Sequence, residues 1–283
     1  MNKKLRYVLI SSVLLGITAY GIKQYIHIMS EALWVKKFRS TDDIQPNLKD
    51  VNLEGLSDLR ISGSNRPVFA DIKKRLKNVK GKIYIVDLTG GDQPYLHGKY
   101  PLDFLGYEAK NPNRYDLRLR RLFINGFGEI LPQDFVSEEI VARQHGFEYL
   151  KFFNTRREPP TSEIIDRIIE IVETLPKDDW LHFHCLGGKG RTTVFMTIVD
   201  ILKNGKKVSL EDIVKRQYLL GGIDLFDVQV WKTKGSYTVE QLTTRKQFVE
   251  NFYTYVNDPH GYGTLTWTQW CKAHNIAGMV ELK

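Results

Sequence analysis

Residues 180–193 read W-L-H-F-H-C-L-G-G-K-G-R-T-T, and this stretch indicates what kind of domain the chain forms. A short strand-like run ends in Cys185, a glycine-rich loop follows, and Arg191 and Thr192 begin an apolar helix. A cysteine and an arginine separated by five residues, at a strand-to-helix turn, predict a phosphate-binding loop with a nucleophile at its base.

The residue types in this loop suit attack on a phosphate ester. Backbone N–H groups at a helix N-terminus and the planar fork of Arg191 bind phosphate oxygens, and the glycines let the loop curl. The same positive field lowers the pKa of Cys185, so its thiolate can attack phosphorus and form a cysteinyl-phosphate that water cleaves. Thr192 can hydrogen-bond the sulfur and help it leave. His184 either orders the loop from beneath or packs in the core.

The alternative is a purely structural role, in which a buried cysteine lies beside a glycine turn. A cysteine and an arginine at this spacing often arise by chance. A preceding strand, loop glycines, a hydroxyl after the arginine and a following helix rarely accompany them by chance, so the context favours the catalytic interpretation.

Composition limits the class of protein. The chain has 283 residues, which suits one domain with an insertion or two small domains. Hydrophobic residues make up 42% and aromatic residues 12%, enough for a sizeable core. The net charge of +8 favours anionic partners or is simply a solvated basic surface. No nucleic-acid partner is predicted, because the chain shows no recognition module or long basic run.

The N-terminal residues are typical of a targeting segment. Lys3, Lys4 and Arg6 precede an almost uncharged apolar run over residues 7–22. This run is short for a membrane-spanning helix and suits a signal peptide. An uncleaved membrane anchor and a buried N-terminal helix are the alternatives. The two cysteines, Cys185 and Cys271, are predicted to be free thiols, since a disulfide would consume the nucleophile.

Strand and helix patterns alternate along the rest of the chain, which predicts an α/β fold with a parallel sheet. Strands are expected at residues 58–63, 82–88, 147–153 and 180–184, and helices at 68–79, 161–175, 192–204, 213–220, 238–256 and 267–274. Thr161, Ser209 and Thr238 are the expected helix N-caps. Residues 90–144 interrupt the pattern with scattered glycine, proline and asparagine, and are interpreted as an insertion of short strands and loops.

Residues 184–192 match the H-C-x-x-G-x-x-R-T signature of cysteine-dependent, protein-tyrosine-phosphatase-like phosphatases. The longer stretch 175–193 resembles the bacterial cysteine phytases, which are inositol polyphosphate phosphatases. Further similarity to that family lies at residues 38–39, 61–64, 216–217, 221–222 and 231–234. The resemblance covers the chain from about residue 38 and is weakest across residues 90–144.

This resemblance implies a protein-tyrosine-phosphatase-like core, with a central sheet flanked by helices and a small β-rich insertion at about residues 90–144. Residues 37–283 would form the phosphatase domain, and residues 1–36 the signal peptide or anchor with a linker. Members are commonly exported, so a periplasmic or cell-envelope location is expected. No cofactor or metal is expected, and the oligomeric state is left open.

A substrate with several phosphates needs several cations. Lys189 supplies one within the loop, and the resemblance adds Arg39, Lys232 and Lys234; any one lysine is equally well an ordinary exposed cation. The predicted substrate-binding residues are Leu186, Gly187, Gly188, Lys189, Gly190, Arg39, Arg156, Arg157, Lys232 and Lys234. The predicted catalytic residues are Cys185, Arg191, Thr192, His184 and Glu158.

The sequence departs from the family where the general acid is expected. The family pattern resembles T-D-H-x-W-P, whereas residues 155–160 read T-R-R-E-P-P, so Arg156 stands in place of the aspartate. Arginine donates no proton near neutral pH. Glu158 is the substitute candidate, with an exposed glutamate paired to Arg156 or Arg157 as the alternative.

Three functions follow from these residues. The first is a phosphatase acting on phytate or related inositol polyphosphates. The second is a catalytically weakened module that binds a polyphosphate or phosphoprotein. The third is a protein-tyrosine phosphatase, which explains the extra cations less well. The complete cysteine loop favours the enzyme, because a binding module has no need of Cys185.

Overall fold

The computed structural model describes residues 3–43, 48, 50–91, 93–107, 110–126, 128–230 and 237–276. The chain folds into two compact units. One comprises Met1–Trp34, Val68–Asp71 and Asp92–Val141, and the other comprises Val35–Pro67, Ile72–Gly91 and Ala142–Lys283. The second unit contains the cysteine loop.

The second unit is built on a five-stranded sheet in the order β1-β2-β8-β3-β7. β2, β8, β3 and β7 run parallel, and β1 pairs antiparallel with β2 at the edge. The strands are β1 (Arg39–Ser40), β2 (Ile61–Ser64), β3 (Ile83–Asp87), β7 (Glu148–Lys151) and β8 (Trp180–His184). The predicted parallel sheet is therefore confirmed, with β8 at its centre.

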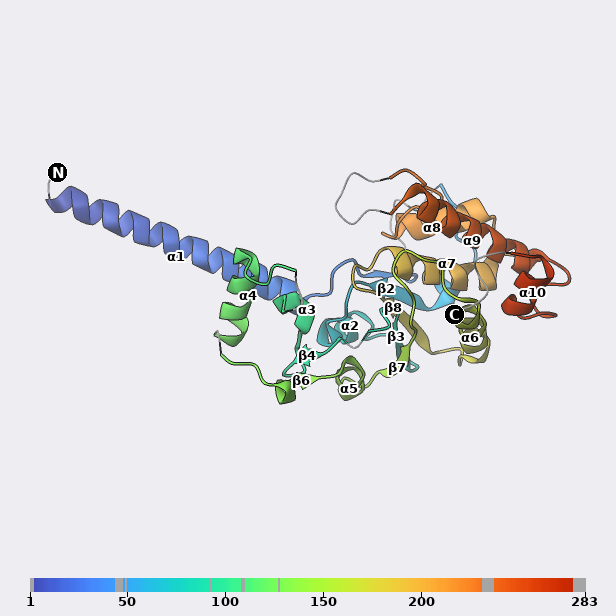
Figure 1. The fold of residues 1–283 in the computed structure, drawn as a ribbon, viewed down its shortest axis with the longest axis horizontal. Helices are drawn as coiled ribbons and strands as arrows, with labels where there is room; N and C mark the ends of the chain where they lie inside the picture. The colour runs from blue at the N-terminus through green and yellow to red at the C-terminus, as the bar shows by residue number, and fades with distance from the viewer. Residues whose placement is uncertain are drawn as a thin grey trace. The chain divides into compact units, whose positions relative to one another are not determined.

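Helices cover both faces of this sheet, as Figure 1 shows: α2 lies on the side away from α7. Leu181 and Phe183 of β8 belong to the main core, together with buried residues of the helices on the α7 side. These helices are α6 (Ser162–Thr174), α7 (Gly190–Asn204), α8 (Leu210–Leu219), α9 (Val239–Asn257) and α10 (Trp267–Ala273), and α2 is Phe69–Arg75. The α/β prediction is confirmed.

Two of the three expected helix N-caps make their predicted hydrogen bonds. Ser209 accepts a hydrogen bond from the Asp212 N–H, and Thr238 forms a capping box with Gln241. Thr161 occupies the N-cap position of α6, but its hydroxyl makes no capping bond. The strand expected at residues 58–63 begins only at Ile61, because residues Ser57–Leu59 form a 3₁₀ turn that ends at the left-handed Arg60 (φ 53°).

The first unit contains a small sheet in the order β5-β4-β6. Its strands are β4 (Tyr95–Leu96), β5 (Tyr100–Pro101) and β6 (Phe135–Val136). Short strands were expected here, but helices were not. They are α3 (Leu102–Leu105) and α4 (Tyr115–Asn125), with a 3₁₀ turn at Pro132–Asp134; α5 (Glu138–Gln144) begins at the end of this unit.

The N-terminal segment forms one helix, α1 (Lys3–Leu33), in the first unit. Near its end, Glu31 accepts a hydrogen bond from Arg120 of α4 at 2.9 Å, and Tyr25 meets Phe123 edge to face. Earlier apolar side chains such as Leu15 are exposed, by 70% in that case, which does not match the alternative of a buried N-terminal helix. Among the described residues, no helix combines the length and the apolar character needed to cross a membrane.

Candidate active site

The cysteine loop lies where the central strand β8 meets the largely buried helix α7. Cys185 directly follows β8, and α7 begins five residues later at Gly190. The carboxyl ends of parallel strands meet at one edge of the sheet, which is where α/β proteins bind ligands. Thr192, Thr193 and nearly all later residues of α7 are buried. The loop is therefore anchored on one side by the sheet and on the other by the core.

Cys185 is a buried thiol that the loop polarises. Its side chain is 4% exposed, and Thr192 Oγ1 donates a hydrogen bond to Cys185 Sγ at 3.2 Å. Burial by itself would raise the pKa of Cys185, but hydrogen bonds from the Thr192 hydroxyl and backbone, the charge of Arg191 and the Gly187 backbone together lower it below its ordinary value. The loop therefore favours the thiolate, as the sequence predicted.

Arg191 is held by backbone carbonyls of two neighbouring strand ends. Its Nη1 donates to Leu88 O at 2.6 Å, just after β3, and to Asn154 O at 3.0 Å, beyond β7. Both contacts use one nitrogen of the guanidinium. Among the described residues no hydrogen bond engages the other amino group or Nε, which leaves them for a bidentate contact with phosphate oxygens. Arg191 thus also ties the cysteine loop to the start of the loop at residues 154–160.

Two glycines of the loop meet different surroundings. Gly188 has φ +64°, and a Cβ there would lie 2.3 Å from Asn65 N, so no other residue fits. Gly190 faces the hydroxyl of Tyr237, which would lie 2.5 Å from an added Cβ. Sequence reasoning missed Tyr237, whose only signal was its place just before the Thr238 capping box.

Arg39 was expected to bind substrate, and the structure places it behind the loop instead. The side chain is 3% exposed; Nη1 donates to Gly188 O at 2.8 Å and Nη2 to Thr193 Oγ1 at 3.1 Å. Burial lowers the pKa of Arg39 to about 10, and this effect outweighs the opposite influence of nearby Cys185. Its guanidinium is used for protein contacts, because β1 pairs with β2 beneath the loop.

His184 lies fully buried beneath the loop, beside Asp87 of β3. Its Nε2 is 3.8 Å from Asp87 Oδ1, and both side chains are inaccessible to solvent. Asp87 also accepts hydrogen bonds from the Thr89 N–H at 2.7 Å and the Tyr149 hydroxyl at 3.1 Å. Burial beneath the loop is compatible with both roles that the sequence left open for His184, ordering the loop and packing in the core.

A second histidine, His182, was not singled out from the sequence. Ser64 Oγ donates to Asn65 O at 2.6 Å, so His182 Nε2 must donate to Ser64 Oγ at 2.9 Å. His182 Nδ1 then accepts from Ser62 Oγ at 2.8 Å, and Ser62 Oγ accepts from Trp180 Nε1 at 2.8 Å. In this series of hydrogen bonds the imidazole of His182 is neutral. Burial, together with nearby His184 and Arg39, holds the pKa of His182 well below its ordinary value, which agrees with the neutral form. This series of hydrogen bonds ends at Asn65, whose backbone packs against Gly188.

The remaining predicted residues lie at the rim or outside the described part of the chain. Leu186, Gly187 and Lys189 are exposed, as are Arg156 and Glu158, whereas Arg157 is half-buried and has φ 76°. Lys232 and Lys234 fall outside the described residues. The structure thus joins the cysteine loop to the loop at residues 154–160 through Arg191. The catalytic role of Glu158 stays a prediction.

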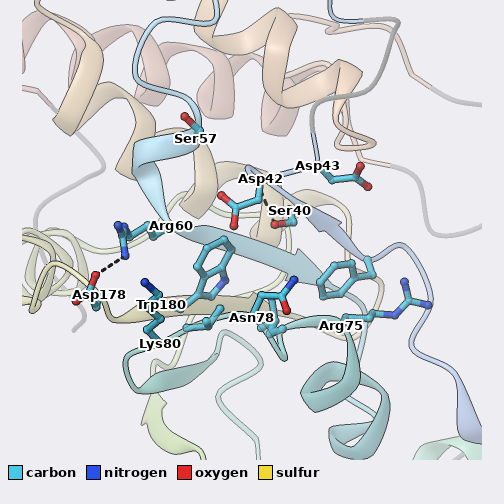
Figure 2. A pocket seen from close by; sticks show the side chains of 13 residues that line it. Ser40, Asp42, Asp43, Ser57, Arg60, Arg75, Asn78, Lys80, Asp178 and Trp180 are labelled. Atoms are coloured by element: carbon cyan, nitrogen blue, oxygen red, sulfur yellow. Dashed lines mark hydrogen bonds and ion pairs between the residues drawn. The ribbon is translucent and has the colours of Figure 1, made fainter.

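A cavity of about 580 Å³ lies in the second unit near the opposite end of β8 (Figure 2). Trp180, which starts β8, lines it together with Arg60 and Asp178, and these two charged groups form an ion pair at 3.1 Å. No residue of the cysteine loop is among its lining residues. The cavity is therefore separate from the candidate active site.

Comparison with known proteins agrees with this geometry. The model of the PTP-like phytase family, which carries the description "Inositol hexakisphosphate", matches residues 107–203. The effector protein hopD2 of Pseudomonas syringae pv. tomato is 26% identical over 267 residues, covering 82% of this chain and 56% of that protein.

Two solved structures are similar in fold and sequence. One is the PTP-like myo-inositol phosphatase of Mitsuokella multacida in complex with myo-inositol-(1,3,4,5)-tetrakisphosphate, with TM-score 0.64 and 26% identity, over 85% of this chain and 47% of that one. The other is a PTP-like phytase of Bdellovibrio bacteriovorus, with TM-score 0.59 and 28% identity, over 84% of this chain and 90% of that one. The chain spans about half the length of the Pseudomonas and Mitsuokella proteins.

Proposed function

Because the chain belongs to the PTP-like phytase family, we propose that it is a phosphatase that removes phosphate from inositol polyphosphates through a cysteinyl-phosphate intermediate. The observation that carries this proposal is the Thr192 hydroxyl 3.2 Å from Cys185 Sγ, in a loop that lowers the pKa of the thiol. A thiol in such a field is an activated nucleophile, whereas a structural cysteine is not.

The reaction has two steps at one phosphorus. In the first, the Cys185 thiolate attacks phosphorus, the P–O ester bond breaks, and the inositol oxygen leaves with a proton. Backbone N–H groups and Arg191 hold the phosphate oxygens as charge shifts between them. In the second, water attacks phosphorus, the S–P bond breaks, and inorganic phosphate and the thiolate are released. Thr192 stabilises the departing sulfur by its hydrogen bond.

The leaving oxygen needs a proton, and the residue that would donate it differs from the family pattern. Arg156 stands where the family places an aspartate, and it cannot supply a proton near neutral pH. Glu158 is exposed in the same loop and is the candidate donor. An inositol alkoxide needs protonation more than a phenolate does, and loss of a general acid costs roughly a hundred- to ten-thousandfold in rate.

The replacement of the aspartate by Arg156 also favours a second candidate, a module that binds inositol polyphosphates without turnover. In that case Arg156 and Arg157 serve as additional phosphate ligands. The intact nucleophile with its Thr192 contact favours the enzyme over this module.

The test is phosphate release from inositol hexakisphosphate by the full chain between roughly pH 4 and pH 8. We expect release by the wild type, none by Cys185→Ser, and a reduced rate for Glu158→Gln. Release that persists in Cys185→Ser contradicts the nucleophile assignment. Wild-type protein that binds the hexakisphosphate but releases no phosphate favours the binding module.

We also propose that the chain is exported to the periplasm or cell envelope. The support is a cationic start, with Lys3, Lys4 and Arg6, followed by the apolar run over residues 7–22. Cleavage of this segment and its retention as a membrane attachment are both compatible with these residues.

A further inference from the structure

We propose that Lys37, Arg39 and Thr193 are positioning residues that hold the cysteine loop in its phosphate-binding form, each by binding one of three consecutive loop carbonyls. The carbonyls are those of Gly187, Gly188 and Lys189. The proposal rests on the proposed function only in taking this loop as the phosphate site.

Lys37 and Arg39 approach the loop from the segment that leads into β1. Lys37 Nζ donates to Gly187 O at 3.0 Å, and Arg39 Nη1 donates to Gly188 O at 2.8 Å. Lys37 is exposed at the outer edge of the loop, whereas Arg39 is buried behind it. Two cations from one short segment therefore engage two adjacent peptide groups of the loop.

Thr193 completes the series from the first turn of α7. Its hydroxyl donates to Lys189 O at 2.8 Å and accepts hydrogen bonds from Arg39 Nη2 at 3.1 Å and from the Ile223 N–H at 3.2 Å. The side chain is 1% exposed, so these partners replace water completely. Thr193 thereby links Arg39, the loop and the chain after α8.

The geometry of the peptide bond turns these contacts into a positioning effect. In a trans peptide the C=O of one residue and the N–H of the next point in opposite directions. Holding the carbonyls of Gly187, Gly188 and Lys189 against these three side chains therefore directs the N–H groups of Gly188, Lys189 and Gly190 away from them. Successive N–H groups that point the same way form an anion-binding nest.

Such a nest needs support when no anion is bound, because its N–H dipoles repel one another. Lys37 and Arg39 supply that support, and both cations also interact favourably with a thiolate at Cys185. Burial and neighbouring Lys189 lower the pKa of Lys37, while Cys185 raises it. Lys37 at the outer edge of the loop and Arg39 behind it thus bring positive charge to the site while their own hydrogen bonds are made to loop carbonyls.

The experiment measures alkylation of Cys185 by iodoacetamide in the full chain, mapped by mass spectrometry. Its dependence on pH reports the thiolate, and protection by inorganic phosphate reports binding, neither of which needs turnover. Burial raises the pKa of Cys271 to about 12, so that thiol reacts little at neutral pH. The variants are Lys37→Met, Arg39→Lys and Thr193→Val, with Thr193→Ser as the rescue and Lys77→Met as the charge-matched control.

Thr193→Val removes three hydrogen bonds, of which the one to Lys189 O holds the loop directly. We expect it to weaken phosphate binding at least about three- to tenfold, and Thr193→Ser to restore it. Arg39→Lys keeps the charge but cannot reach two acceptors at once, so it weakens phosphate binding with little change in the alkylation midpoint. Lys37→Met weakens binding and moves the alkylation midpoint to higher pH. Lys77→Met changes neither.

Thermal unfolding of each variant is followed in parallel, and Thr193→Ser and Lys37→Met carry the test if Thr193→Val does not fold. Wild-type phosphate affinity in both Lys37→Met and folded Thr193→Val, or the same shift in Lys77→Met, overturns the proposal. Phosphate protection of Cys185 without release from inositol hexakisphosphate contradicts the proposed function and leaves this inference standing.

Discussion

Gly188 and Gly187 are adjacent in the sequence but under very different constraints. Gly188 adopts φ +64°, and its missing Cβ leaves room for the backbone of Asn65. At Gly187 a Cβ would meet no atom of the described residues within 4 Å, and φ lies outside the left-handed region. The tight approach of β2 to the loop therefore depends on one glycine and not on its neighbour.

This difference predicts opposite results for two alanine variants. Gly188→Ala should displace the loop from Asn65 and lower phosphate release about a hundredfold, since a misplacement of about 1 Å has that effect on catalysis. Gly187→Ala is the matched control and should stay within about threefold of wild type, because its methyl group enters open space. Steady-state phosphate release measures both, and equal losses in the two variants contradict this reading.

At the same scale, residue type was a poor guide to where each cation lies relative to the loop. Arg39 and Arg191 look alike in sequence, yet Arg39 binds Gly188 O and Thr193, and Arg191 binds the carbonyls at the strand ends. Only the fold shows that Arg39 lies behind the loop. Lys37 belongs to no motif recognised in the sequence, yet its Nζ donates a hydrogen bond to Gly187 O.

At the scale of elements, α7 is fixed by a buried charge cluster at its far end. Asp200 accepts hydrogen bonds from Arg216 Nε at 2.8 Å, Gln217 Nε2 at 2.9 Å and Asn204 Nδ2 at 3.0 Å. Arg216 also donates to the carbonyls of Asn52 and Glu54. The cluster therefore joins α7 to α8 and to the chain before β2, which keeps α7 aligned behind the loop.

Breaking this cluster should destabilise the fold strongly. Asp200→Ala leaves the fully buried Arg216 without its carboxylate, and we expect a loss of about 3–5 kcal/mol in the free energy of unfolding. Urea denaturation measures it. Adding Arg216→Met to Asp200→Ala should recover part of the loss, because the unpaired charge is gone.

Thr197→Val is the control within α7. Its hydroxyl is buried without a hydrogen-bond partner among the described residues, so removing it should be neutral or slightly stabilising. A loss for Thr197→Val as large as that for Asp200→Ala means that α7 is sensitive to any change, and the charge cluster then has no special role.

The strongly periodic elements were predictable because their pattern depends on local burial. Ile165, Ile168, Ile169 and Val172 of α6 are buried at the spacing that predicted the helix. α4 was missed because Leu117 is its one buried residue. The helix also carries four charged side chains, namely Asp116, Arg118, Arg120 and Arg121. A helix with so little core contact has no clear hydrophobic period.

At the scale of the whole molecule, export is predicted to depend on the apolar run of α1. A fusion of residues 1–36 to a reporter enzyme that is active only outside the cytoplasm should be active in a bacterial host. Leu14→Arg places a charge in the run and should abolish reporter activity, whereas Leu14→Ala keeps the run apolar and should preserve it. Equal activity from all three fusions argues against an export signal.

By itself, the sequence determined the α/β class, the strand at residues 180–184, the order of the helices after it and the loop that carries Cys185 and Arg191. These features are local: each is encoded by periodicity, glycine placement or spacing within a few turns of the chain. Tertiary structure alone decided which side of the loop each cation occupies, the chain of hydrogen bonds through His182, and the three side chains that bind the loop carbonyls. Those contacts join residues about 150 positions apart, such as Arg39 and Gly188, and no local pattern encodes them.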